Sequence, residues 1–323
     1  MRQFVSLIVL AGAVLAAGSG QAQDNFPSRP LRILVGLGPG SGSDVLARVI
    51  AQKLSDTLKQ GVVVDNRPGA GGIVAAELLT RASPDGYTLG IIGLPTHAFQ
   101  AAYYKKLPYD ALKDFAGITM VADMPQVLVV SPLLRVKSMR ELMELGKSKP
   151  GQINFGSAGI GMAAHTIAEQ FNIAAGIKAI HVPFKGMVEA LTTLIGGDVQ
   201  YVFASVTSVV ALVKSEKVVA LAVSSKLRSP ALPDVSAMAE VGMPGFDFTT
   251  VYGLLAPAKT PKAEKDKLAR EIAQVLARPD VIGSLLAQGG TARTCGPEEF
   301  DQFIRDEHAR MVKLIKQVGI RTE

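Results

Sequence analysis

A glycine-rich stretch, residues 36–44 (GLGPGSGSD), contains residue types that suit ligand binding through the backbone. It follows an apolar run at residues 31–35 and precedes residues 45–58, whose apolar positions repeat with the period of a helix. The first N–H groups of a helix lack intrahelical acceptors, the helix end carries partial positive charge, and glycines permit close approach. We therefore predict an anion site built on five backbone N–H groups, those of Gly40, Ser41, Gly42, Ser43 and Asp44. Ser43 or Asp44 is the expected helix N-cap.

A second loop of the same kind lies in the other half of the chain. Residues 153–155 (INF), apolar at both ends, lead into residues 156–161 (GSAGIG), and a helical pattern follows from about residue 162 to residue 175. The same argument predicts a second set of anion-binding backbone N–H groups, those of Ser157, Ala158, Gly159, Ile160, Gly161, Met162 and Ala163.

Other interpretations of these loops stay open on residue patterns alone. The first loop could be a plain tight turn, or a dinucleotide loop, because Asp65 ends a strand about 20 residues after the glycines. However, Ser41 stands where the dinucleotide fingerprint needs its third glycine. A hydrolase triad could be drawn from Ser41 or Ser157, His97 or His165, and Asp44, but the chain has no Gly-x-Ser-x-Gly elbow. We predict neither a catalytic site nor a cofactor.

The spacing of the histidines and the distribution of charge argue against a metal-binding protein and a nucleic-acid-binding protein. His97, His165, His181 and His308 do not follow a metal-binding spacing such as His-Glu-x-x-His, so no metal site is expected. The net charge of +6 is spread without blocks of Lys or Arg, and only 6% of residues are aromatic. Nucleic acid is therefore not an expected partner.

The first 22 residues have the pattern of a secretory signal peptide. A charged start is followed by an apolar run at residues 4–17 and by small residues before an expected cleavage after Ala22. The apolar run is too short to span a bilayer comfortably, and no direct membrane insertion is expected. The single Cys295 cannot form an internal disulfide, so an exported chain must fold without one.

Strand and helix patterns alternate along the mature chain, which predicts an α/β fold of two domains, each with a mostly parallel sheet flanked by helices. The pattern loosens after residue 96, which places His97 in a loop, and two separate strands are expected near residues 117–122 and 126–130. Because each half contains one glycine-rich loop, we expect a ligand cleft between the halves.

Several short motifs, taken together and in order, resemble the Bug or TctC-like family, the periplasmic solute-binding receptors of tripartite tricarboxylate transporters. They are PGSGSD at 39–44, DNRPGAGG at 65–72, PDGYTL at 84–89, LPYD at 107–110, VPFKG at 182–186, LIGG at 194–197, RSPALPDV at 228–235 and YGLLAP at 252–257. The resemblance covers essentially the whole mature chain.

The resemblance implies a type II periplasmic binding fold. Residues 23–123 and 247–323 would form domain 1, and residues 124–246 would form domain 2. The two glycine loops would hold a ligand carboxylate by their N–H groups, and Tyr252 would lie at the crossover between the domains. The expected location is the periplasm, the expected partners are the membrane components of such a transporter, and the expected state is a monomer. A receptor that feeds a sensor is an alternative.

Several positions depart from the pattern usual in this family. Apolar or small residues replace polar or aromatic ones at Leu37, Ile160, Met162, Ala164, Ala204, Ser205 and Val251. Backbone capture of an anion survives such changes, whereas side-chain contacts to an amino or hydroxyl group do not. These departures predict a less polar ligand, an aromatic or aliphatic carboxylate (dicarboxylates included), in preference to an amino acid or citrate.

Overall fold

The structure, a computed structural model, describes residues 26–320. The predicted signal peptide lies outside the described residues. One group of strands has the order β2-β1-β3-β9-β4, with the short β10 added to β4. Their bounds are β1 Leu31–Val35, β2 Val62–Asn66, β3 Thr88–Gly93, β4 Phe115–Val130, β9 Thr249–Pro257 and β10 Thr291–Ala292. β1 pairs with β2 and β3 in parallel, whereas β9 and β4 pair antiparallel.

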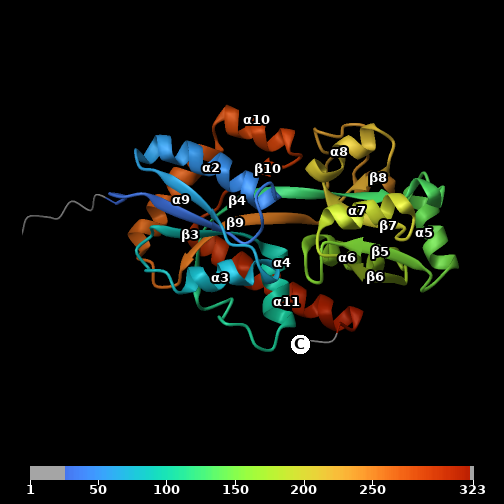
Figure 1. The fold of residues 1–323 in the computed structure, drawn as a ribbon, viewed down its shortest axis with the longest axis horizontal. Helices are drawn as coiled ribbons and strands as arrows, with labels where there is room; N and C mark the ends of the chain where they lie inside the picture. Colours follow the sequence, from blue (N-terminus) through green and yellow to red (C-terminus); the bar gives the residue numbers. More distant parts are fainter. Residues whose placement is uncertain (1–25, 321–323) are drawn as a thin grey trace, which may run out of the picture.

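The second group of strands is built on the far end of β4, in the order β4-β7-β5-β6, with β8 also paired to β4. The bounds are β5 Ile153–Ser157, β6 Ala179–Pro183, β7 Tyr201–Ser205 and β8 Val219–Val223. β4 pairs with β9 up to Pro125 and with β7 and β8 from Gln126 onward. A single long strand therefore passes through both halves of the molecule (Figure 1).

Helices cover both faces of the first group of strands (Figure 1). α2 Gly42–Leu58, α9 Lys262–Leu276 and α10 Pro279–Ala287 pack on one face, against Leu31 and Ile33 among others. α3 Ile73–Thr80, α4 Leu94–Tyr103 and α11 Pro297–Val318 lie on the other face. Side chains alternate between the two faces along β1, which explains the two layers of helices. Ile33 packs with residues of α2, α9 and α10, whereas Leu34 points to the opposite face and packs with residues of α3, α4 and α11.

The second group of strands is covered in the same way. α5 Met139–Ser148 and α6 Ala163–Ala175 pack on one face with Phe155 and Tyr201. α7 Met187–Gly196 and α8 Val206–Lys214 pack on the other face with Val127 and Val202. Three short 3₁₀ turns complete the elements, η1 Ala70–Gly72, η2 Pro132–Leu134 and η3 Met238–Val241.

The fold class is confirmed, with one difference in the sheet. The sheet is mixed and not mostly parallel, because β4 and β9 run antiparallel to their neighbours. The two strands predicted between residues 117 and 130 are one strand, buried along almost all of its length. The division into domains at residues 123/124 and 246/247 stays a prediction.

Three local predictions are wrong. The predicted loop around His97 is the helix α4, which begins with Pro95 in its first turn. The helix α10 was not expected at all. The N-cap of α2 is Ser41, whose hydroxyl accepts from the N–H of Asp44, and not Ser43 or Asp44. Within residues 26–320, no helix is long and apolar enough to cross a bilayer.

Candidate functional site

The loop between β1 and α2 is fastened by the carboxylate of Asp44, which is 2% exposed. Its Oδ2 accepts from the N–H of Gly40 at 2.9 Å, and its Oδ1 accepts from Nδ2 of Asn66 at 2.9 Å. The Nε of Arg48 donates to the same carboxylate at 3.0 Å. Arg48, and then Gly40 and Asn66, keep the pKa of Asp44 below its usual value despite burial. Asp44 therefore stays ionised and holds the loop in shape.

These contacts decide which of the predicted N–H groups can reach a ligand. The N–H groups of Gly40 and Asp44 donate to side chains of the loop, and that of Ser41 donates to the carbonyl of Gly38. Among the described residues, none accepts from the N–H groups of Gly42 and Ser43, the first two of α2. The predicted set of five is thus reduced to Gly42 and Ser43.

The loop between β5 and α6 is fastened by neutral side chains. The Ser157 hydroxyl accepts from the N–H of Gly159 at 3.1 Å and donates to the carbonyl of Gly159 at 3.0 Å. The N–H of Gly161 donates to Nδ1 of His165 at 3.0 Å, and the N–H of Met162 donates to the carbonyl of Gly159. The first N–H groups of α6, those of Ala163 and Ala164, have no acceptor in the described part of the chain.

Two stacked histidines support this second loop. The rings of His165 and His181 lie with centroids 3.9 Å apart, and Phe155 stacks on His181 from the core. Nε2 of His181 lies 2.7 Å from the Ser157 hydroxyl. Burial, and secondarily the neighbouring His165, lowers the pKa of His181 to about 3. His181 is therefore neutral at ordinary pH, and the loop contains no carboxylate like that of Asp44.

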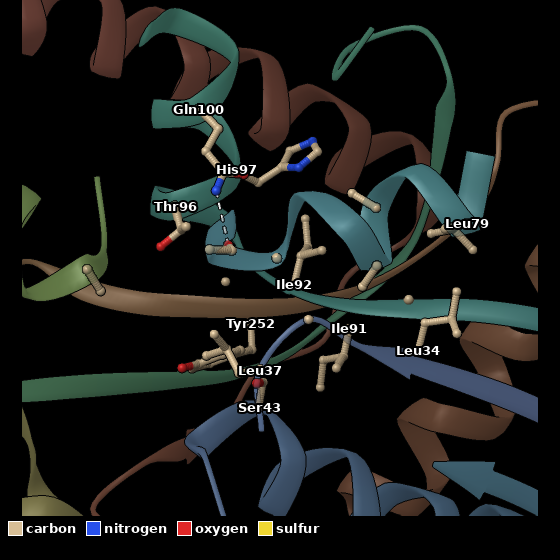
Figure 2. Close-up of a pocket in the computed structure, with 18 of the residues that line it drawn as sticks. Leu34, Leu37, Ser43, Leu79, Ile91, Ile92, Thr96, His97, Gln100 and Tyr252 are labelled. Carbon is tan, nitrogen blue, oxygen red and sulfur yellow. Dashed lines mark hydrogen bonds between the residues drawn. The ribbon is translucent and has the colours of Figure 1, made fainter. Parts of the chain in front are cut away.

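One cavity of about 100 Å³ lies between the two loops (Figure 2). Its lining includes the first turns or N-caps of four helices: Ser43 of α2, Gly72 before α3, Gly93 and Thr96 at α4, and Met162 and Ala163 at α6. α2, α3 and α4 start where the parallel strands β1, β2 and β3 end, and α6 starts where β5 ends. β5 runs in the opposite direction to the first three strands, and the carboxyl ends of strands are where α/β proteins commonly bind ligands. Four helix N-termini aimed at one space favour an anion there.

No side chain that carries a charge is among the described residues that line this cavity. His97 is 4% exposed, its Nε2 contacts the carbonyl of Ala111, and burial lowers its pKa, so it is neutral. Burial raises the pKa of Tyr252 to about 12. The positive character of the cavity therefore comes from backbone dipoles alone.

The structure brings one third of the predicted binding residues to the cavity wall. These are Leu37, Ser43, His97, Met162, Ala163 and Tyr252. The other loop residues, Gly40, Ser41, Gly42 and Asp44 in the first loop and Ser157, Ala158, Gly159 and Gly161 in the second, shape the loops that carry them. Gly42 lies close to the wall, since a Cβ there would be 3.3 Å from the Tyr252 hydroxyl oxygen.

Four predicted residues lie elsewhere. Ile160 is exposed, and Val251 is buried in the cluster with Met120 and Phe300. Ala204 is buried in β7, and Ser205 caps the backbone of α8, with its hydroxyl near that of Ser208. None of them lines the cavity, and their role in binding stays a prediction.

Several lining residues were missed. They include Gly71, Gly72, Thr96, Gln100 and Thr250. The glycine-rich residues 69–72 were visible in the sequence, and a proline at position 95 after a strand is a signal for a helix start. Gln100 fastens the glycine turn to α4, because its Nε2 donates to the carbonyl of Gly71 at 3.0 Å.

Strands that cross between two helix-covered halves, with an uncharged cavity at helix N-termini, form an α/β arrangement that suits a small anionic ligand. The model of the tripartite tricarboxylate transporter family receptor matches residues 46–320. The chain belongs to this family, and the Bug or TctC-like resemblance is confirmed. Members are solute-binding receptors, so the chain is a receptor of that kind and not an enzyme.

Three relatives are similar over nearly their whole length. Protein BugT of Bordetella pertussis is 32% identical over 99% of both chains. The structure of R. palustris Rpa4515 with adipate has a TM-score of 0.83 at 29% identity, covering 92% of this chain and 99% of that one. MatC of Rhodopseudomonas palustris with bound malate has a TM-score of 0.77 at 30% identity, covering 90% and 100%.

Proposed function

We propose that this chain captures a small carboxylate in the periplasm and delivers it to the membrane components of a tripartite tricarboxylate transporter. The observation that carries the proposal is an uncharged cavity lined by helix N-termini from both halves of the molecule. Two similar receptors have adipate or malate in their structures, which supports a carboxylate as the anion.

The proposed binding groups are backbone amides. The N–H groups of Gly42 and Ser43 from one side, and of Ala163 and Ala164 from the other, would donate to the carboxylate oxygens. Hydrogen bonds to an ionised acceptor are stronger than neutral ones. Because each half of the molecule supplies one pair, the ligand would favour the closed arrangement by its differential affinity.

We further infer that the chain is exported, with cleavage near Ala22, and that the receptor is a monomer. The proposed domain boundaries lie at residues 123/124 and 246/247. Transfer to a membrane partner would follow capture, with no bond made or broken.

The proposal is tested by calorimetric titration of the chain from Gln23 with a panel of carboxylates that includes pentanoate, adipate and malate, each beside its amide or diamide. At least one of the acids should bind and none of the amides should. Gly42→Val should abolish binding, because a Cβ at Gly42 already comes within 3.3 Å of the Tyr252 hydroxyl oxygen. Ser43→Ala, the matched control, should change the affinity less than threefold, since it keeps the N–H group. The reverse ranking of the two variants would contradict backbone binding.

A further inference from the structure

The cavity has a polar end and an apolar end. In Figure 2, Ser43, Thr96 and Tyr252 lie at one end of the lining residues, and Leu34 and Leu79 lie at the other. Met162 and Ala163 of the second half also line the cavity. A carboxylate at the helix N-termini would thus direct the rest of its molecule toward the leucines.

The apolar end provides no partner for a second charge. In Figure 2, Ile91 lies next to Leu34 at this end. The other apolar lining residues are Ala75, Ala76, Ile92 and Phe115, and no described residue of the lining is charged. An ionised carboxylate buried without a partner is strongly disfavoured. The part of the ligand that enters this end is therefore uncharged and apolar.

The size of the cavity limits that part to a short chain. A cavity of about 150 Å³ accepts benzene, which has six carbons. In proportion, a cavity of about 100 Å³ has room for about four carbons. The walls are also tightly packed, because a Cβ at Gly36 would be 2.6 Å from Cα of Gly72, and one at Gly90 would be 2.7 Å from Cδ2 of Leu79.

We propose that the apolar end of this cavity holds the aliphatic chain of a monocarboxylate with about three to four carbons beyond the carboxyl group. This inference rests on the proposed carboxylate function and specifies its substrate class. It separates this chain from the two similar receptors whose structures contain the dicarboxylates adipate and malate. It also excludes the aromatic carboxylates that the sequence left open.

The first experiment is a calorimetric series on the wild-type chain from Gln23 with acetate, propanoate, butanoate, pentanoate and hexanoate. Each methylene that enters the apolar end should raise the affinity about fourfold. The gain should stop at butanoate or pentanoate, when the cavity is full. Pentanoate should bind at least tenfold more tightly than adipate, malate or benzoate, and pentanamide should not bind.

The second experiment fills the cavity. Ala76→Val adds two methyl groups to the apolar wall on α3 and should weaken pentanoate binding at least tenfold while changing acetate binding less than twofold. Ala101→Val is the matched control, because it makes the same change on α4 at a position outside the cavity wall. It should leave both affinities within twofold. Thermal melts without ligand establish that both variants fold, and the wild-type series decides the question if either does not.

The outcomes separate the two proposals. Adipate, malate or benzoate binding as tightly as pentanoate, or affinity independent of chain length, would overturn the monocarboxylate inference and leave the carboxylate receptor intact. Failure of every carboxylate to bind would overturn the proposed function and this inference with it.

Discussion

The two glycine loops both present free backbone N–H groups, but different side chains hold each loop in shape. Each presents the first two N–H groups of a helix, Gly42 and Ser43 on α2 or Ala163 and Ala164 on α6. The first loop is shaped by an ionised carboxylate, which Arg48 partners. The second loop is shaped by the hydroxyl of Ser157 and by Nδ1 of His165, which accepts from the N–H of Gly161, with His181 stacked behind.

This difference shows that the backbone arrangement is what the two halves share. The side chains that fasten it can be charged or neutral, provided that they satisfy the remaining N–H groups of the loop. The two loops should therefore respond differently to substitution and to pH.

The largest effect is expected from a methyl group at the glycine that precedes α6. In Gly161→Ala the new Cβ would lie 2.3 Å from Cδ1 of the buried Phe99, at a backbone φ of +76°. Overpacking and backbone strain together should lower the free energy of unfolding by about 3 kcal/mol. Gly40→Ala in the first loop has a similar φ of +81° but open space, and should cost about 1 kcal/mol. Equal losses in urea unfolding would show that the contact with Phe99 is unimportant.

A smaller loss is expected when the first loop loses its charge. Asp44→Asn removes the ionised acceptor shared by Gly40, Arg48 and Asn66, and should lower the free energy of unfolding by about 2 kcal/mol. The exposed Asp280, which pairs with Lys53 and Arg278, provides the control. Asp280→Asn should leave the urea midpoint nearly unchanged. A midpoint for Asp44→Asn that matches this control would remove Asp44 from its structural role.

The smallest effect is a pH dependence to which the second loop contributes through His181. The pKa of His181 is about 3 in the folded chain and about 6.5 when unfolded, so the unfolded state takes up the proton first as the pH falls. Stability is fully present above pH 6.5 and should fall by about 1 kcal/mol between pH 6.5 and 5.5. His97, whose pKa burial also lowers, adds to the same window.

His181→Gln should reduce this slope without abolishing it, because glutamine keeps a donor for the Ser157 hydroxyl but does not titrate. Asp44→Asn should leave the slope unchanged, since the lowered pKa of Asp44 places its titration below pH 3.8. Urea unfolding at several pH values measures both. An unaltered slope in His181→Gln would assign the acid sensitivity to other groups.

The sequence was sufficient for those parts of the fold that depend on local pattern. Apolar runs followed by glycine and a helical period predicted β1 with α2 and β5 with α6 correctly. The helix α4 was missed because aromatic residues near its end obscure the helical period, although Pro95 marks its start. The long β4 was predicted as two strands because Pro125 lies at the point where its partners change.

The site was only partly predictable, because local sequence patterns do not show which backbone N–H groups stay free to bind a ligand. Which N–H groups stay free depends on side chains that fold back onto the loops, as Asp44 does onto Gly40 and His165 onto Gly161. Glycine content does not reveal these bonds. The cavity wall also uses residues such as Gln100 and Thr250, which are far apart in the chain and meet only through the sheet order.

The contact between Gly161 and Phe99 has a kinetic consequence. It joins the loop before α6 to α4, beside Met162 and Ala163 in the cavity wall, and Arg310 of α11 adds a second link by donating to Gln170 of α6 at 3.2 Å. In the proposed capture of a ligand, exchange would require these contacts to separate, so the opening rate would set an upper limit on the rate of release. At high ligand concentration the observed rate of association should therefore reach a plateau at the opening rate, and a transporter that pulls α6 away from α4 would accelerate unloading.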